Sequence, residues 1–302
     1  MSTQVLVKKA KTTGKPRNSR VVLLLLLPGI FYLGLFFITP FVSLITTSLQ
    51  APVLGGGIGV YQPGLEFGNY VFVVTEYFDQ IIRSFIYATL ATLLALAISY
   101  PIAYFIAVKA RNRPVLQALL LTLVIAPFFI SFLLRTFAWK QVFGQNSWLS
   151  NILRDTGLMA DDQFLLGSSF AVVFGLTYNF IPFMTLPLYT NLERLDTALL
   201  EAGSDLYATP TSTFWKVTFP LSIPGITSGT LLTFIPVAGD FVTASGNFLG
   251  SPSTSMLGNV IEANYITIQD FPSASALSVL LMAAIVVLVS VYIRRTGTED
   301  LL

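Results

Sequence analysis

Residues 200–220 read LEAGSDLYATPTSTFWKVTFP, a partly charged stretch that lies between two long apolar runs. Apolar side chains in and before it recur at the spacing of one helical face, at Leu195, Leu199, Ala202 and Leu206. Glu201 and Asp205 lie four residues apart on another face. Either Asp196 or Thr197 is placed to cap the helix. The pattern predicts a helix on a membrane surface that presents an apolar and acidic face to a soluble protein, although an ordinary amphipathic connector has the same spacing.

The composition is that of a membrane protein. Of the 302 residues, 54% are hydrophobic and 11% are charged, and the mean hydropathy is +0.74, whereas a soluble domain carries roughly a quarter charged residues. The chain has no cysteine and no histidine, which argues against disulfides, imidazole catalysis and a metal site. Gly14-Lys15 lacks the flanking residues of a phosphate-binding loop. The chain is therefore not expected to be an enzyme that hydrolyses ATP.

Six apolar runs are long enough to cross about 30 Å of hydrocarbon as helices, which takes roughly 20 residues each. They cover residues 21–48, 81–108, 115–137, 164–188, 221–242 and 274–293. Prolines inside these runs are expected to bend the helices. The sequence predicts an all-α integral membrane protein with six transmembrane helices and a surface segment, residues 195–216, between spans four and five.

Basic residues set the expected orientation. They cluster in residues 1–20, in the turn at 109–113, around the surface segment and after span six, all on one side if there are six spans. Both termini are therefore predicted to be cytoplasmic, with a basic tail over residues 1–20 and a transmembrane domain over residues 21–302. The run after the tail is too long for a signal peptide and has no small-x-small site, so we expect an uncleaved first span. The tail has no interleaved aromatics, and no nucleic-acid partner is expected.

The surface segment resembles the EAA loop of binding-protein-dependent ABC importer permeases. That family pattern reads Glu-Ala-Ala, three residues, Gly, nine residues and Ile-x-Leu-Pro, and the motif residues 201–203 and 217–220 have this spacing. The resemblance implies the type I permease fold and coupling helices that seat in a groove of an ATPase. The implied contact residues are Glu201, Ala202, Gly203, Asp205, Leu206, Tyr207, Ala208 and Pro220. Two positions depart from the pattern, because Gly203 replaces the second alanine and Tyr207 occupies the glycine position, where glycine permits a left-handed turn.

Other segments resemble the first permease subunit of spermidine/putrescine transporters. They are residues 126–139 (APFFISFLLRTFAW), 234–241 (FIPVAGDF), 257–262 (LGNVIE) and 270–278 (DFPSASALS). The resemblance implies a bacterial inner-membrane permease for polyamines, although relatives with the same skeleton carry opines, iron, thiamine and other small solutes. It also implies a second permease, two copies of an ABC ATPase that bind ATP and Mg, an external solute-binding protein and surrounding lipid. This chain itself would hold no cofactor.

Asp240 is the one acidic residue inside a predicted span. An ionised carboxylate in the bilayer costs several kcal/mol, so it usually faces a pathway or a partner. Asp240 lies 16 residues beyond Pro224 and is expected toward the outer end. It could face a cationic solute, or it could be a structural cap, with Arg135 as a candidate partner. Arg135 either snorkels to the interface or forms an outer gate or partner contact together with Trp139.

Aromatic side chains in the spans could line a cation pathway through their ring faces. Tyr104, Phe128 and Tyr178 are the candidates, and helix packing is the alternative for each. Outside the spans, residues 148–154 (WLSNILR) have the spacing of a short interfacial helix. A carrier driven by an ion gradient alone is the rival class. Such carriers bury several ionisable groups, whereas Asp240 is solitary.

Overall fold

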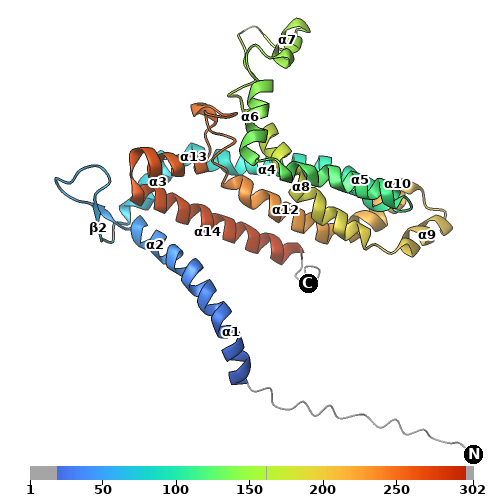
Figure 1. Ribbon diagram of the computed structural model, residues 1–302, viewed down its shortest axis with the longest axis horizontal. Helices are drawn as coiled ribbons and strands as arrows, with labels where there is room; N and C mark the ends of the chain where they lie inside the picture. The colour runs from blue at the N-terminus through green and yellow to red at the C-terminus, as the bar shows by residue number, and fades with distance from the viewer. Residues whose placement is uncertain (1–18, 161, 297–302) are drawn as a thin grey trace, which may run out of the picture.

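The computed structural model describes residues 19–160 and 162–296, which are mostly helical (Figure 1). The basic tail predicted over residues 1–20 lies outside the described residues except for its last two. The N-terminal half contains α1 (Ser19–Leu33), α2 (Thr39–Ser48), α3 (Gly68–Glu76), α4 (Phe78–Tyr104), α5 (Pro114–Ile125), α6 (Phe132–Val142) and α7 (Trp148–Asp155). The C-terminal half contains α8 (Ser169–Glu193), α9 (Thr197–Asp205), α10 (Pro210–Thr213), α11 (Phe219–Leu221), α12 (Ile223–Ala238), α13 (Leu257–Glu262) and α14 (Phe271–Thr296). Within these ranges the strands β1 (Ala51–Pro52) and β2 (Tyr61–Gln62) pair as a small antiparallel hairpin.

Helices that can cross a membrane correspond to the six predicted spans. Four described stretches are long and apolar enough by themselves: Leu24–Ser48, Phe78–Lys109, Ser169–Glu193 and Phe271–Arg294. Two more are bent pairs. Pro114–Phe129 meets Phe132–Val142 at 92°, and Pro210–Leu221 meets Ile223–Ala238 at 60°. Counting each bent pair as one span gives the predicted six.

Three of the spans differ from their predicted course. The fifth, predicted over residues 221–242, is the helix α12, which ends at Ala238 before Asp240, and its bent partner Pro210–Leu221 begins inside the predicted surface segment. The third changes direction because Ile130 and Ser131 adopt extended backbone conformations just after the 3₁₀ turn η3 (Ala126–Phe129), which contains Pro127. The fourth begins and ends five residues later than predicted. Its N-terminus is fixed by Ser168, whose hydroxyl accepts a hydrogen bond from the Ala171 amide at 3.2 Å.

Prolines explain two π-helical turns in the spans. The turns η1 (Gly34–Ile38) and η4 (Phe214–Thr218) each lead into a helix whose first turn contains a proline, Pro40 or Pro220. Proline has no backbone N–H and clashes with the carbonyl four residues earlier, so the preceding turn widens and its hydrogen bonds shift. The helices therefore continue through these prolines with a local change of pitch.

The core of the molecule is the packing of α4, α8 and α12 against one another. Small residues such as Ala88, Ala91 and Ala95 are fully buried on α4 and let α8 approach closely. Hydrogen bonds cross the same interfaces. The Tyr100 hydroxyl lies 2.9 Å from that of Ser222, and the Ser99 hydroxyl donates to the Ile181 carbonyl at 3.2 Å. This trio of helices places the surface segment at one end and α13 at the other (Figure 1).

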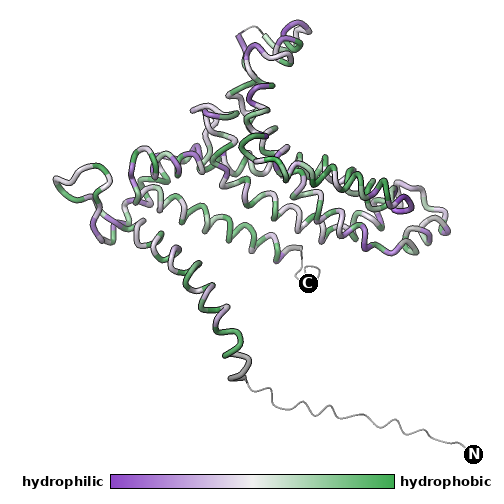
Figure 2. The backbone as a smooth tube through the Cα atoms, viewed as in Figure 1, coloured by the Kyte–Doolittle hydropathy of each residue, from purple (hydrophilic) through white to green (hydrophobic). Residues whose placement is uncertain are grey.

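The first span stands apart from this core. Figure 1 shows α1 leaving the body, while α2 packs against α14. None of the most apolar window of Leu24–Ser48 is buried inside the chain. Figure 2 shows that hydrophobic residues continue along this isolated span. Its apolar surface is therefore available to lipid or to another protein chain.

Candidate functional site

The beginning of the surface segment is held by Arg111, from the turn between α4 and α5. Its guanidinium donates to the carbonyl oxygens of Glu193 and Leu195, the latter at 3.0 Å. The Asp196 carboxylate accepts a hydrogen bond from the Ala198 amide at 2.9 Å, so Asp196 supplies the predicted cap of α9. Arg111 thus fixes the junction between the end of α8 and the beginning of α9. The sequence indicated only a role in topology for this arginine.

A second group of side chains ties α5 to the same end of α8. The Tyr189 hydroxyl donates to Glu193 Oε1 at 2.6 Å. Gln117 Nε2 donates to the Tyr189 oxygen at 3.2 Å and to Glu193 Oε1 at 3.3 Å. A displacement of the surface segment is therefore resisted by α5 as well as by α8. Sequence reasoning did not identify these residues, because they are far apart in the chain and form no recognisable motif.

The C-terminus of α9 keeps a left-handed turn although tyrosine stands where the family pattern has glycine. Tyr207 has φ 56°, and the Ala208 amide donates to the Gly203 carbonyl at 3.0 Å. A left-handed residue followed by this six-residue closure is a Schellman-type end of a helix. The Tyr207 side chain is 97% exposed. The replacement therefore preserves the turn and adds an aromatic ring to the surface.

Gly203, the other departure from the pattern, lies where α9 meets α10. A Cβ atom built on Gly203 would lie 3.0 Å from Thr213 Oγ1 and 3.1 Å from Thr213 Cγ2. An alanine would need Thr213 to move by a few tenths of an ångström. Thr209 caps α10 by accepting a hydrogen bond from the Ser212 amide at 3.2 Å. The two short helices are thus packed as one unit.

The outer surface of this unit combines apolar and acidic side chains. Exposed residues are Leu199, Glu201, Ala202, Asp205, Leu206, Tyr207, Trp215 and Pro220, while Gly203 and Ala208 are half-buried. The predicted apolar stripe is therefore uncovered over most of its length, since only Leu195 packs into the core. Uncovered apolar residues next to carboxylates are typical of a protein interaction surface.

The end of the surface segment is anchored by aromatic packing. The Phe214 ring lies 5.7 Å from the rings of both Tyr100 and Tyr104 of α4, in edge-to-face geometry. Trp215 and Phe219 lie 5.2 Å apart in the same group. Tyr104, predicted as a pathway residue, is thus placed where α4 holds the surface segment.

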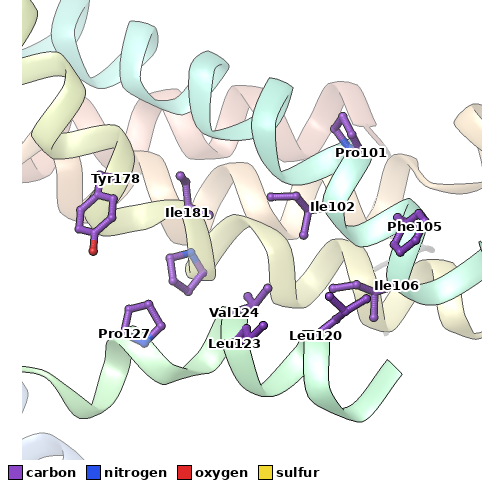
Figure 3. A pocket seen from close by; sticks show the side chains of 11 residues that line it. Pro101, Ile102, Phe105, Ile106, Leu120, Leu123, Val124, Pro127, Tyr178 and Ile181 are labelled. Carbon is purple, nitrogen blue, oxygen red and sulfur yellow. The ribbon is translucent and has the colours of Figure 1, made fainter. Parts of the chain in front are cut away.

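Tyr178, another predicted pathway residue, lines a crevice of about 500 Å³ between α4, α5 and α8 (Figure 3). Proline rings and aliphatic side chains surround it, among them Pro101, Pro127, Leu120 and Ile181. The Tyr178 hydroxyl is the polar group among these side chains. This crevice offers little to a charged solute.

A second crevice, the α8–α12 groove, has a different lining. It measures about 530 Å³ and is lined by Phe128, Phe183, Leu186, Pro187, Thr190, Asn191, Arg194, Pro224, Gly225, Ser228 and Leu232. Four of these residues are polar or charged. The predicted pathway residue Phe128 lies at this groove, and its ring meets that of Phe183 edge-on at 5.0 Å. The groove therefore combines aromatic rings with hydrogen-bonding side chains.

The remaining predicted site residues lie near the ends of the spans opposite the surface segment. Asp240 is 7% exposed, and its carboxylate accepts hydrogen bonds from the Thr243 amide at 2.7 Å and the Thr243 hydroxyl at 3.1 Å. Asp240 thus caps the turn after α12, and no hydrogen bond or ion pair joins it to Arg135 within the described chain. Arg135 is 8% exposed on α6, and its guanidinium carbon lies 5.9 Å from the Phe132 ring centroid. Its Nε and Nη1 atoms are buried without a partner among the described residues. The interfacial snorkelling position considered from sequence does not fit this burial.

Trp139 packs between α6 and α8. Its ring lies 4.6 Å from that of Phe174 and 5.3 Å from that of Tyr178. The following loop leads to α7, whose extent agrees with the predicted interfacial helix and whose Trp148 is 64% exposed. An outer gate or partner role for Arg135 and Trp139 stays a prediction, as does a pathway role for Asp240, Tyr104 and Tyr178.

Up to six candidate spans, with an exposed helical unit between α8 and α12, are typical of a membrane permease that docks to a soluble partner. The chain matches the family described as binding-protein-dependent transport system inner membrane component over residues 99–295, and it belongs to this family. It is thus an ABC importer permease subunit, an inner-membrane protein with several membrane-spanning helices.

Curated relatives and solved structures agree with this family. The chain is 34% identical over 239 residues to the spermidine/putrescine transport system permease protein PotB of Haemophilus influenzae, covering 79% of this chain and 82% of that one. It is 34% identical over 221 residues to PotB of Escherichia coli, covering 73% and 78%. Among structures, a bacterial ABC transporter that imports the acidic polysaccharide alginate aligns over 92% of this chain and 95% of its own, with a TM-score of 0.67 and 16% identity. At that identity the likeness supports the fold alone.

Proposed function

We propose that this permease imports polyamines, spermidine or putrescine, as part of an ATP-driven transporter. The observation that carries the proposal is the 34% identity to PotB proteins over about four fifths of both chains. The transporter would contain a second permease, two copies of a cytoplasmic ATPase that bind ATP and Mg, and an external solute-binding protein. This chain would have no enzymatic activity and hold no cofactor. Both termini and the surface segment would face the cytoplasm.

The α9–α10 unit is the part of this chain that would dock to the ATPase. Its exposed apolar and acidic side chains suit a partner groove with apolar walls and basic edges. Closure of two ATPase subunits around ATP would draw the units of the two permeases together and open the pathway outward. Hydrolysis would return the pathway inward. The ties from Arg111 and Phe214 support this role, because they carry a displacement of the unit into α8 and α4.

The solute is tested by uptake of labelled spermidine and putrescine in cells that lack this gene and have no other polyamine importer. We expect uptake to be lost and then restored by a plasmid copy of the gene. If the knockout accumulates both polyamines at the rate of the parent strain, the permease carries another small solute.

Docking is tested by reversing one charge on the α9–α10 unit. Glu201→Lys should weaken ATPase binding by roughly fivefold, or about 1 kcal/mol, because an exposed charge at an interface rim contributes modestly. Co-purification of the ATPase with tagged permease measures this. Glu76→Lys, an exposed charge reversal at the end of α3, is the matched control and should retain the ATPase. Equal recovery of the ATPase with both variants would exclude Glu201 from the docking surface.

A further inference from the structure

The α8–α12 groove is walled by two helices that the surface segment joins. Its α8 wall ends at Arg194, one residue before the segment begins. Its α12 wall starts at Pro224, three residues after the end of α11 (Phe219–Leu221). The surface segment is therefore covalently attached to the α8 wall directly, and to the α12 wall through residues 217–223, which include α11. A movement of α9 and α10 changes the distance between the walls unless it is absorbed in these connections.

Asn191 is the polar residue at the narrow contact between the walls. A Cβ atom built on Gly225 would lie 2.7 Å from Asn191 Cβ and 3.2 Å from Asn191 Oδ1. Only glycine leaves the Asn191 amide room against α12. Asn191 Oδ1 is buried and has no hydrogen-bond partner in the described part of the chain. A buried acceptor without a partner is costly. A donor on a solute would satisfy it once the two walls move apart, because the oxygen is covered at the separation seen here.

The hydroxyl groups of the groove can also accept hydrogen bonds. The Thr190 hydroxyl donates to the Leu186 carbonyl at 2.9 Å and keeps its oxygen free to accept. Ser228 adds a second hydroxyl from the opposite wall. Pro187 has no N–H, so it cannot bond the Phe183 carbonyl oxygen four residues earlier. Thr190 and Asn191 on α8 and Ser228 on α12 thus carry the oxygen acceptors among the side chains that line the groove.

Charge and aromatic rings complete this lining. None of the groove residues, all of which the structure describes, carries a carboxylate, and Arg194 stands at the end next to the surface segment. The edge-to-face pair Phe128 and Phe183 lies among the same residues, and ring faces attract ammonium groups. Neutral acceptors and rings bind an ammonium group weakly, which suits passage because a solute in transit must also leave.

We infer that the α8–α12 groove is an inner transit site for an alkylammonium solute, with Asn191 as its central acceptor and the surface segment setting its width. The inference rests on the proposed import of polyamines and assigns that function a site. Arg194 repels a cation that has reached the inner end and so favours its release. The groove is open along one side of this chain, which a second permease would cover.

The first test compares Asn191 variants in the complete transporter reconstituted in proteoliposomes with labelled spermidine. Asn191→Leu should lower uptake at low spermidine concentration about tenfold, while ATPase co-purification is unchanged. Asn191→Asp keeps the size of the side chain and adds a charge, so KM and the maximal rate should both fall as the solute leaves more slowly. A purely structural role would not produce this joint fall. Thr122→Val, an exposed change on α5 away from the groove, should transport normally.

The outcomes separate this inference from the proposed function. If the unmodified transporter imports spermidine and both Asn191 variants keep its KM and maximal rate, the groove is not the transit site. If the unmodified transporter imports neither polyamine, the proposed solute is wrong.

A second measurement tests the changing width of the groove without any solute. The chain contains no cysteine, so Thr190→Cys and Ser228→Cys can carry a pair of spin labels, one on each wall. The distance between the labels should differ between nucleotide-free and ATP-bound complexes. An identical distance in both states would overturn the inferred control of the groove by the surface segment.

Discussion

The helix α8 and the apolar stretch Leu24–Ser48 of α1 and α2 have opposite surroundings. Each covers 25 residues, Ser169–Glu193 with a mean hydropathy of 1.5 and Leu24–Ser48 with 2.1. Of their most apolar windows, 61% is buried inside the chain for α8 and none for the first span. The more apolar helix is the one that the chain leaves uncovered.

This difference shows which property decides whether a membrane helix lies inside the bundle or at its surface. Lipid is as apolar as leucine, so hydropathy gives no preference for a position inside the bundle. Close packing and hydrogen bonds do favour a position inside the bundle. The helix α8 has buried residues that provide them, including Gly175, Thr177, Asn179 and Thr185. Gly29 and Gly34 of the first span have no atom within contact distance of an added Cβ. The first span is therefore built to meet lipid or another chain.

The largest effect should come from filling the contact between α12 and α8. A Cβ atom on Gly229 would lie 2.8 Å from Met184 Sδ and 3.1 Å from the Met184 carbonyl oxygen. Gly229→Leu should therefore separate the two helices and abolish cooperative unfolding of the purified chain. Gly29→Leu makes the same change on the uncovered span and should leave the unfolding temperature of the chain unchanged. Thermal unfolding in detergent measures both, and a similar loss in both variants would contradict the comparison.

A smaller effect is expected from removing a packed side chain without adding one. Leu188 on α8 is fully buried between α4 and α12, whereas Leu27 on α1 is 53% exposed. Leu188→Ala should lower the unfolding free energy by about 2 kcal/mol, the lower end of the range for a leucine cavity, because unfolded helices remain in an apolar medium. Leu27→Ala should change it by less than about 0.5 kcal/mol. Chemical unfolding in micelles gives both values, and equal losses would show that α1 packs on the body of the chain.

How much of this arrangement the sequence predicts depends on the kind of signal. The six spans, α7 and the helix break before Pro210 follow from local patterns, because length, hydropathy and motif spacing are properties of contiguous residues. Tyr207 made the turn after α9 uncertain from sequence, yet the backbone keeps φ 56° there. The hydrogen bond to the Gly203 carbonyl at the end of α9 therefore stabilises the left-handed turn by more than the tyrosine side chain destabilises it.

Long-range features were not predictable in this way. No local pattern indicates that Arg111 binds the carbonyls at the end of α8, or that Asn191 faces Gly225. Asp240 was noticed because a carboxylate in an apolar run is rare, and the structure shows it capping a turn through Thr243. Rarity drew attention to the residue, whereas its partners depend on how the chain folds after α12.

The smallest expected change in unfolding free energy concerns the hydrogen bond between α8 and α6. The described part of α1 makes no such bond to another helix. Asn179 Nδ2 donates to Thr136 Oγ1 at 3.0 Å, while Asn179 Oδ1 is buried without a partner in the described chain. Thr136→Val removes the acceptor and leaves the whole amide unpaired, so it should cost about 1 kcal/mol. Asn179→Leu removes the bond and the unpaired oxygen together, and should cost less.

The double variant of Thr136 and Asn179 then decides whether the bond itself matters. Once Asn179 is leucine, Thr136→Val leaves no amide unpaired, so its cost should nearly vanish. The coupling energy between the two sites should therefore be about 1 kcal/mol, which lies within the range for hydrogen bonds between membrane helices. Unfolding free energies of the four chains provide this number. Additive losses would mean that α8 holds α6 by packing alone, and that close contact rather than polarity separates α8 from the uncovered first span.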